Sequence, residues 1–489
     1  MTFSEIVSTA SSWVWGIPII VLLIATGFYF SIRTRFLQVR YFKEMIQMLF
    51  QGKSSANGIS SFQSFALALS GRVGTGNIAG VATAIALGGP GAVFWMWFIA
   101  FFGAGTAYVE ASLGQIYKEE IDGHYRGGPA YYILKGLKNK YFAMAFALTT
   151  IISLGLLLPG VQSNAICDAF YNSFRMEKPI TAGIIVFLLA LVIFGGVKRL
   201  AKVAEYVTPF MAVGYVLVAL VILAINHQHI PSMFALIFKS AFGLEPAMSG
   251  VVGAAISMGV KRGVFSNEAG QGTAPHAAAA CDVPHPAKQG LVQAFSVYVD
   301  TLLVCSATAL IILATGMYNV YDTVGNVVFR GGGLPLSETG YGPIFTQMAV
   351  DTSIPGLGSA FVSIALFFFA FTTIMSYYFQ AESNVYFIFR KKRTAFYMIN
   401  LLRVAVLFVT FFTAVNAMTL AWNMADIGVG IMAWLNLIAL ILLQKTALKT
   451  FSDFEEQFKS GIKKPVFHPD KLGIENADEW HTVNYPDKS

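Results

Sequence analysis

Long apolar stretches separated by short polar segments make up most of this chain. A helix of about 20 mainly apolar residues crosses the roughly 30 Å hydrocarbon core of a bilayer. Eleven stretches fit that length, so the pattern predicts an all-α, polytopic membrane protein with about eleven transmembrane helices. They run approximately over Trp15–Ile32, Phe62–Leu87, Gly91–Tyr117, Tyr141–Phe170, Pro179–Val197, Val203–Ile225, Ala247–Ala277, Leu291–Gly316, Ile354–Ile388, Ala395–Val415 and Met418–Leu443.

The first stretch differs from a cleaved signal peptide. It has no basic segment before Trp15 and no convincing small-residue cleavage site after it. We therefore expect a retained extra helix over 15–32. Over Arg33–Gln51, apolar residues recur at helical spacing among basic residues, which predicts an interfacial helix there.

Glycine and charge interrupt two of the other ten stretches. One contains "SGRVGTGNIAG", Ser70–Gly80, and the other contains "SMGVKRGVFSNEAGQG", Ser257–Gly272. We expect the breaks at Gly71, Gly74 and Gly76 and at Gly259, Lys261, Arg262 and Gly263.

The broken stretches are the first and the sixth of the ten, so they cross in opposite directions. That relation is typical of a five-plus-five inverted repeat whose broken helices bind the substrate at mid-membrane. The predicted organisation is a membrane domain over 1–445, with inverted repeats over 62–225 and 247–443, followed by a tail over 446–489.

A break of this kind predicts a ligand. An unpaired backbone group in hydrocarbon costs several kcal/mol, so a helix unwinds only where protein or ligand supplies a partner. Freed amides suit a carboxylate, and freed carbonyls suit a hard cation such as sodium. Gly76, Gly80 and Ala84 also fit a small-residue packing face, but Arg72 and Asn77 have no place in one.

Soluble and catalytic explanations have little support. The spacing of Gly74, Gly76 and Gly80 is not the dinucleotide pattern, and no lysine followed by serine or threonine completes a P-loop. The histidines lie mostly in loops and the tail, without an H-E-x-x-H motif. We expect a protein that is not an enzyme.

The second broken stretch carries both acid and base. We expect Lys261, Arg262 and Glu268 to neutralise one another or a partner such as Arg72, and only secondarily to relay protons. Ser257 and Gly259 are the better ligand candidates there.

Other apolar stretches carry isolated polar groups. Gln162 and Asn164 could bond a substrate or another helix. Thr372 and Thr373, with Ser376, could supply hydroxyl ligands to sodium or bond within their own helix.

Two acids lie inside predicted spans. Glu110 and Asp300 are costly there unless they are paired. We expect both to belong to structural ion pairs, with a proton or ion site as the alternative.

Composition agrees with a membrane protein, and charge gives its orientation. The 489 residues are 56% hydrophobic and 12% charged, and the net charge of +7 is segregated by loop rather than gathered in one patch for nucleic acid. The basic loops include Arg33–Lys53, Lys118–Lys140, Lys198–Lys202 and Arg390–Arg393, whereas the opposite loops hold only Arg175, Lys178, Lys239 and Arg330. The positive-inside rule predicts an outside amino terminus and a cytoplasmic tail.

Two motifs carry a resemblance to a known family. "SGRVGTGNIAGVATAIALGGPGAVFWMWFIAFFG", Ser70–Gly103, and "FSNEAGQGTAPHAAAA", Phe265–Ala280, resemble the signature regions of the alanine or glycine:cation symporters. With "YVEASLGQIYK" and "YVDTLLVCSATALIIL" the match covers nearly the whole membrane part. The resemblance implies a LeuT-like fold of the amino acid-polyamine-organocation superfamily, sodium as the coupling ion, no other cofactor, and a small neutral amino acid as substrate.

The resemblance also assigns residues. It implies that the substrate carboxylate binds the amides of Gly74 and Gly76, and that sodium binds two carbonyls and the hydroxyl pair. The expected substrate-binding residues are Gly74, Thr75, Gly76, Asn77, Gln162, Ser257, Gly259 and Tyr377. The expected sodium ligands are Ser70, Val73, Thr372 and Thr373.

One departure bears on the substrate. Members of that family often have glycine and then tryptophan after the hydroxyl pair, where this chain has Ser376 and Tyr377. A smaller, more polar wall leaves room for glutamine.

The sequence therefore predicts a cell-membrane symporter that imports alanine, glycine or glutamine with sodium by alternating access. A proton-coupled or uncoupled transporter is the alternative, with Glu110, Asp300 or Glu268 as the titrating group. The absence of repeated pore-lining charge argues against a channel. The expected partners are the amino acid, sodium and the lipid bilayer.

Overall fold

A computed structural model gives the fold of residues 2–52, 54–245, 250–322, 325–334, 342–416 and 419–482. Within these described residues, eight helices are long and apolar enough to cross a membrane. The other three predicted spans are the two broken helices and the shorter helix α11 (Lys178–Ile193). All eleven apolar stretches thus correspond to a helix or a pair of helices, although the predicted starts at Ala247 and Met418 lie outside the described residues.

The predicted extra helix is longer than expected and bent. Helices α1 (Phe3–Val14) and α2 (Ile17–Arg33) meet at Trp15 and Gly16. The segment expected to lie at the interface follows as two short helices, α3 (Leu37–Arg40) and α4 (Phe42–Leu49).

The first half of the core contains the first broken helix. It consists of α5 (Ser61–Arg72), the π-helical turn η1 (Gly76–Gly80) and α6 (Val81–Gly88). The other membrane helices of this half are α7 (Gly91–Ile116), α9 (Lys140–Ile152) continued through η2 (Ser153–Leu157) into α10 (Leu158–Phe174), α11, and α12 (Gly196–Ile225).

The second half begins with the second broken helix, α14 (Val252–Asn267) and α15 (Ala274–Ala279). The others are α16 (Pro286–Val297) continued through η5 (Tyr298–Cys305) into α17 (Ser306–Thr315), then α19 (Gly358–Ile388), α20 (Lys392–Val415) and α21 (Thr419–Lys459). The predicted start of the tail at 446 falls inside α21.

The two broken helices run antiparallel, as predicted. Helix α5 packs against α15, while α6 and η1 pack against α14. The ends of α5 and α15 are also joined by backbone hydrogen bonds between Ile59 and the segment 280–282.

The second break is not where the sequence placed it. Gly259 and Gly263 lie inside α14, which continues to Asn267. The helix ends where Glu268 takes up the left-handed conformation, with φ of +57°, and Gly270 and Gly272 continue the break with φ of +85° and +82°.

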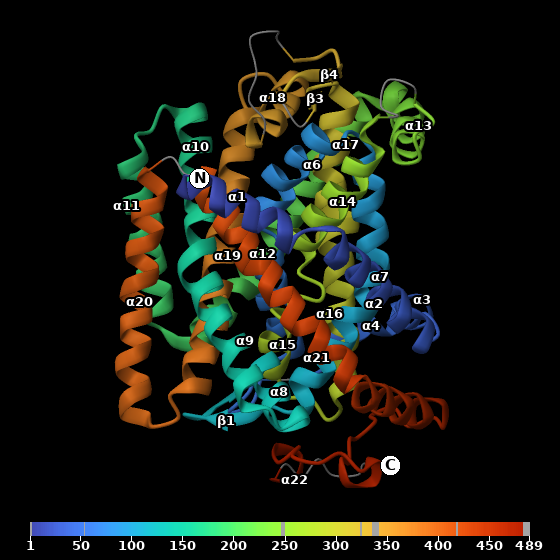
Figure 1. Ribbon diagram of the computed structural model, residues 1–489, viewed down its shortest axis with the longest axis vertical. Coiled ribbons are helices and arrows are strands. Elements are labelled where there is room, and N and C mark those ends of the chain that lie inside the picture. Colours follow the sequence, from blue (N-terminus) through green and yellow to red (C-terminus); the bar gives the residue numbers. More distant parts are fainter. Residues whose placement is uncertain are drawn as a thin grey trace.

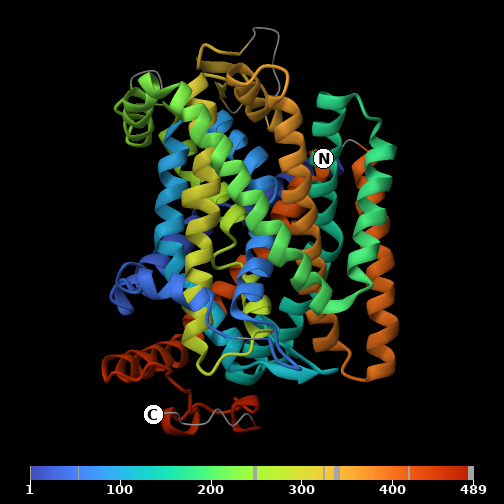
Figure 2. The ribbon, with the colours of Figure 1, turned by 180° about the vertical axis from the view of Figure 1, so that it is seen from behind.

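Short elements cover the two ends of the bundle (Figure 1). At one end lie η3 (His227–His229), α13 (Ile230–Ala241), α18 (Pro343–Ser353), and the antiparallel strands β3 (Asn319–Tyr321) and β4 (Val327–Arg330). At the other lie the antiparallel strands β1 (Glu119–Ile121) and β2 (His124–Arg126), with α8 (Pro129–Leu137), η6 (Asp470–Leu472) and α22 (Glu479–Thr482). Figure 2 shows α11 and α20 side by side at one edge of the bundle, where they pack together.

Candidate functional site

Carbonyl oxygens of the first break converge on one hydroxyl. Thr373 on α19 places its Oγ1 2.9 Å from the carbonyl oxygen of Ser70 and 3.2 Å from that of Val73. The carbonyl oxygen of Phe369, in its own helix, is 2.9 Å away. A hydroxyl has one hydrogen and cannot satisfy three acceptors at once. The cluster is therefore rich in oxygen, as a site for a hard cation is.

Thr372 does not join this cluster. Its hydroxyl lies 2.9 Å from the carbonyl oxygen of Phe368 and 3.1 Å from that of Phe369, one turn earlier in the same helix. The structure thus brings together three of the four expected sodium ligands. Thr372 instead bonds within its own helix, which was the alternative that the sequence left open.

The amides of the break face side-chain oxygens. The Gly74 amide donates to Asn77 Oδ1 at 2.8 Å, and the Thr75 amide donates to Gln162 Oε1 at 3.0 Å. The buried Thr75 hydroxyl finds no hydrogen-bond partner in the part of the chain that the structure describes. Since an amide N–H that binds a carbonyl oxygen can equally bind a carboxylate oxygen, Gln162 marks a position that a substrate carboxylate can take.

Close approach requires glycine at position 74 and packs Gly76 tightly. A Cβ at Gly74 would lie 2.5 Å from Thr373 Oγ1 and 3.0 Å from Gln162 Oε1. A Cβ at Gly76 would lie 3.2 Å from the Cα atom of Ser266 and 3.3 Å from the Phe265 ring. Any side chain at Gly74 would therefore displace the groups that define the site.

Asp300 on η5 is buried beside the break. It accepts hydrogen bonds from Asn77 Nδ2 at 2.7 Å, from Ser266 Oγ at 3.0 Å and from Thr301 Oγ1 at 2.7 Å. No lysine, arginine or histidine nitrogen lies within 4 Å of it among the described residues. The predicted ion pair is wrong for Asp300: hydrogen-bond donors hold it instead.

Glu110 is held in the same way. Its Oε2 accepts from the Gly272 amide at 3.2 Å and from Asn436 Nδ2 at 2.9 Å, whereas its Oε1 has no hydrogen-bond partner in the described ranges. Within the described part of the chain it also makes no ion pair, so this prediction is wrong for the same reason.

The charges of the second broken helix find a different partner from those expected. Lys261 Nζ lies 2.6 Å and Arg262 Nη2 3.1 Å from Asp426 Oδ2 on α21. Glu268 accepts a hydrogen bond from Thr273 Oγ1 at 2.8 Å. Lys261 and Arg262 thus neutralise a partner, as expected, but that partner is Asp426 rather than Glu268 or Arg72. Glu268 interacts electrostatically with Arg72, without an ion-pair contact among the described residues.

Arg72 is buried beside the break with little to hold it. Its Nη1 donates to the Gln293 carbonyl at 3.0 Å and to Ser296 Oγ, while Nε and Nη2 have no hydrogen-bond partner among the described residues. The arginine thus joins α5 to α16. It makes no ion-pair contact among the described residues, but it interacts electrostatically with the carboxylates of Glu268, Glu110 and Asp300.

Ser257 and Gly259 lie outside the cluster. A Cβ at Gly259 would lie 2.5 Å from the carbonyl oxygen of Ala92, so this glycine permits close packing of α14 on α7. Ser257 precedes Ser266 by nine residues, or about 13 Å of helix. Ser266, which the sequence did not single out, is the hydroxyl of α14 that meets the break.

Tyr377 lies one helical turn after Thr373. It is 2% exposed, and its hydroxyl faces the Glu268 carboxylate. Its neighbour Ser376 donates to the carbonyl oxygen of Leu67 at 3.0 Å. The two residues therefore lie beside the first broken helix, as a wall of the site requires.

A cavity of about 400 Å³ lies away from this cluster, between α13, the end of α17 and β4. His229, Met233 and Tyr318 are among the residues that line it. None of the predicted site residues does.

Comparison with known proteins gives a consistent result. A model of the sodium:alanine symporter family matches residues 1–469. The "Sodium/proton-dependent alanine carrier protein" of Bacillus sp. (strain PS3) is 50% identical over 89% of this chain and 97% of its own. The "Probable sodium/glutamine symporter GlnT" of Bacillus subtilis (strain 168) is 42% identical over 98% of this chain and 96% of its own. The structure of MhsT with L-phenylalanine shares the fold, with a TM-score of 0.56 at 16% identity over 82% of this chain and 93% of that one.

Proposed function

The chain belongs to the sodium:alanine symporter family, and from that premise we propose that it imports a small neutral amino acid with sodium through a site at the first broken helix. The protein is a multi-pass membrane transporter with a LeuT-like fold, not an enzyme, and sodium is the coupling ion of its family.

The observation that carries the site is the convergence of Ser70, Val73 and Thr373. The carbonyl oxygens of Ser70 and Val73 lie 2.9 and 3.2 Å from the hydroxyl oxygen of Thr373. Oxygen ligands of this kind suit sodium, and the freed carbonyls of an interrupted helix are where transporters of this design bind it.

The amino acid would bind on the other side of the same short segment. Its carboxylate would replace Gln162 Oε1 at the Thr75 amide, and the released Gln162 amide nitrogen could then donate to it. Asn77 is already committed to the Gly74 amide and to Asp300. It therefore orders the segment rather than contacting the substrate freely.

Coupling follows from this shared segment. Sodium at the carbonyls and a carboxylate at the amides would both fix the conformation of residues 73–76. Each ligand therefore lowers the cost of ordering that the other has to overcome, which is a positive coupling free energy between the two sites. No covalent step is needed.

The substrate is alanine, glycine or glutamine in this proposal. The family description names alanine, and a relative's name includes glutamine. Ser376 and Tyr377 form the part of the wall that would decide between them.

The testing experiment is uptake of labelled alanine, glycine and glutamine into proteoliposomes, with an inward sodium gradient and then with potassium in its place. We expect one of the three amino acids to accumulate, and only when the sodium gradient is present. Equal uptake in potassium would contradict sodium coupling.

A proton is the second candidate for the coupling cation. Asp300 and Glu110 are fully buried acids without a cation within 4 Å among the described residues, and the PS3 relative is named as sodium/proton-dependent. Uptake driven by a pH gradient without sodium in the same liposomes would support it.

We also propose the orientation that the basic loops predict, with the amino terminus outside and the tail in the cytoplasm of a cell-membrane protein. The two halves over 62–225 and 247–443 would then be the repeats that rock against each other. Impermeant labelling of cysteines introduced at either terminus would test the orientation.

A further inference from the structure

The tail turns back beneath the membrane bundle after α21 ends at Lys459 (Figures 1 and 2). The Phe467 amide donates to the carbonyl oxygen of Pro284 at 3.0 Å, in the loop that follows α15. Trp480 is 7% exposed, and its indole donates to the carbonyl oxygen of Gln115 at 3.2 Å, at the end of α7. Two buried aromatic residues thus fasten the tail to two membrane helices.

Lys118 connects the tail to the second broken helix. Its ammonium lies 5.0 Å from the Trp480 ring centroid and 4.2 Å from that of Tyr125 in β2. The same nitrogen donates to the carbonyl oxygen of Cys281 at 3.1 Å, just beyond α15. One buried cation therefore contacts the tail, the β1–β2 hairpin and the end of the broken helix.

The tail also contacts α8, which leads into α9. Asn476 Nδ2 donates to the carbonyl oxygen of Lys135 at 2.9 Å, and Lys135 Nζ lies 2.9 Å from Asp478. The exposed pair of Lys138 and Glu475 adds a contact at 2.8 Å. The tail thereby bridges α7 and α15 on one side and α8 on the other.

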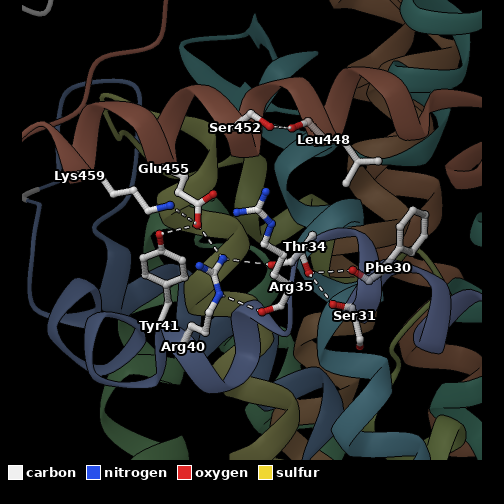
Figure 3. Close-up of polar contacts among 10 residues, drawn as sticks. All are labelled: Phe30, Ser31, Thr34, Arg35, Arg40, Tyr41, Leu448, Ser452, Glu455 and Lys459. Atoms are coloured by element: carbon white, nitrogen blue, oxygen red, sulfur yellow. Dashed lines mark hydrogen bonds and ion pairs between the residues drawn. The ribbon is translucent and has the colours of Figure 1, made fainter.

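A separate cluster fixes where the tail begins (Figure 3). Glu455 on α21 lies 2.6 Å from Arg40 Nη2 and accepts a hydrogen bond from the Tyr41 hydroxyl at 3.1 Å. Lys459 lies 3.4 Å from the same carboxylate. These contacts hold the end of α21 against α3 and α4, so the tail starts from a fixed point.

We propose that residues 460–482 form an autoinhibitory latch on this face of the transporter. While docked, the tail holds the ends of α7, α15 and α8 together and keeps the path from the first break to this face closed. Opening to this face requires Trp480 and Phe467 to leave their sites. The proposal rests on the proposed function, because only alternating access requires this face to open.

Native cysteines provide the test. Cys281 is buried under the latch, whereas Cys167 is buried in α10 near the opposite end of the bundle. Alkylation of each by an impermeant maleimide, applied to the full-length protein from the tail side, reports opening of that face. We expect Trp480→Ala, and separately Phe467→Ala, to label Cys281 about tenfold faster, which corresponds to about 1.4 kcal/mol.

The controls separate the latch from a general loosening. Glu475→Gln breaks only the exposed pair with Lys138 and should label Cys281 at the wild-type rate. Wild-type rates in both aromatic variants, or equal acceleration at Cys167, would overturn the latch. Sodium-dependent uptake measured on the same preparations decides the proposed function separately, because labelling of Cys281 does not depend on the driving ion.

Discussion

The hydroxyl oxygen of Thr373 lies 2.9 Å from the carbonyl oxygen of Ser70, so one contact joins α19 of the second half to the broken helix of the first. The two residues are 303 positions apart in the chain. An ion bound between them would hold the two halves in one relative position, and its release would let them separate. At the proposed ion site, this contact would therefore connect ion binding to conformation.

Thr373→Ala should weaken sodium binding. It removes a hydroxyl that meets two freed carbonyls, and a hydrogen-bonding group next to a charge contributes about 1.5–3 kcal/mol, or roughly ten- to a hundredfold in affinity. The sodium dependence of labelled alanine binding to the purified protein measures this. Thr372→Ala is the matched control, because that hydroxyl bonds only backbone of its own helix turn and a sulfur. Equal effects of the two variants would remove Thr373 from the ion site.

Gly74→Ala should weaken sodium-dependent substrate binding by roughly five- to 150-fold. The added Cβ would lie 2.5 Å from Thr373 Oγ1, so the threonine or the break has to move, and overpacking of this kind costs about 1–3 kcal/mol. Gly80→Ala in the same helix is the control, since its nearest neighbour, the Thr75 carbonyl oxygen, is 3.9 Å away. Binding curves and thermal unfolding of both variants give the comparison. A Gly74→Ala protein with normal binding would show that the geometry of the break is not needed.

Asp426→Asn should destabilise the protein strongly. It leaves Lys261 and Arg262 without the carboxylate that they share, and breaking a buried pair costs about 3–5 kcal/mol. Thermal unfolding in detergent measures the loss. Glu475→Gln breaks a fully exposed pair and should leave the unfolding temperature almost unchanged. If the two losses were similar, the pairing at Asp426 would be of little consequence.

Stability should fall as the pH drops below about 6.5, through His285 in the loop between α15 and α16. Burial lowers the pKa of His285 from its ordinary 6.5, and the hydrogen bond to Asp453 opposes this. Below pH 6.5 this histidine binds a proton more readily in the unfolded chain than in the folded protein. The free energy of unfolding therefore decreases as the pH falls. Unfolding temperatures of wild type and His285→Asn from pH 8 to 5 would show it. A variant that keeps the full pH dependence would assign it to another group.

The sequence located the first break correctly because glycines and an asparagine stand where an apolar helix should continue. It misplaced the second break because "GVKRG" also interrupts an apolar stretch with glycine and charged residues. Two long-range facts decide the matter: Gly259 packs against the backbone of Ala92, and Arg262 pairs with Asp426, 164 residues away. Neither partner can be read from the local pattern. The predicted ion pairs of Glu110 and Asp300 failed similarly, because their partners are amides and hydroxyls from other helices.

The sequence and the structure favour different serines of α14 as the residue beside the site, and substitution of each serine tests which is correct. The sequence favoured Ser257, whereas the structure places Ser266 3.0 Å from Asp300 and its Cα atom beside Gly76. Ser266→Ala should therefore weaken sodium-dependent alanine binding by about tenfold, as expected for the loss of a buried hydrogen bond to a charged group of about 1.5 kcal/mol. Ser257→Ala should leave binding unchanged, because this residue lies about 13 Å further along the helix. If Ser257→Ala had the larger effect, the ligand would bind near the amino-terminal turns of α14, and the role of Asp300 would be structural only.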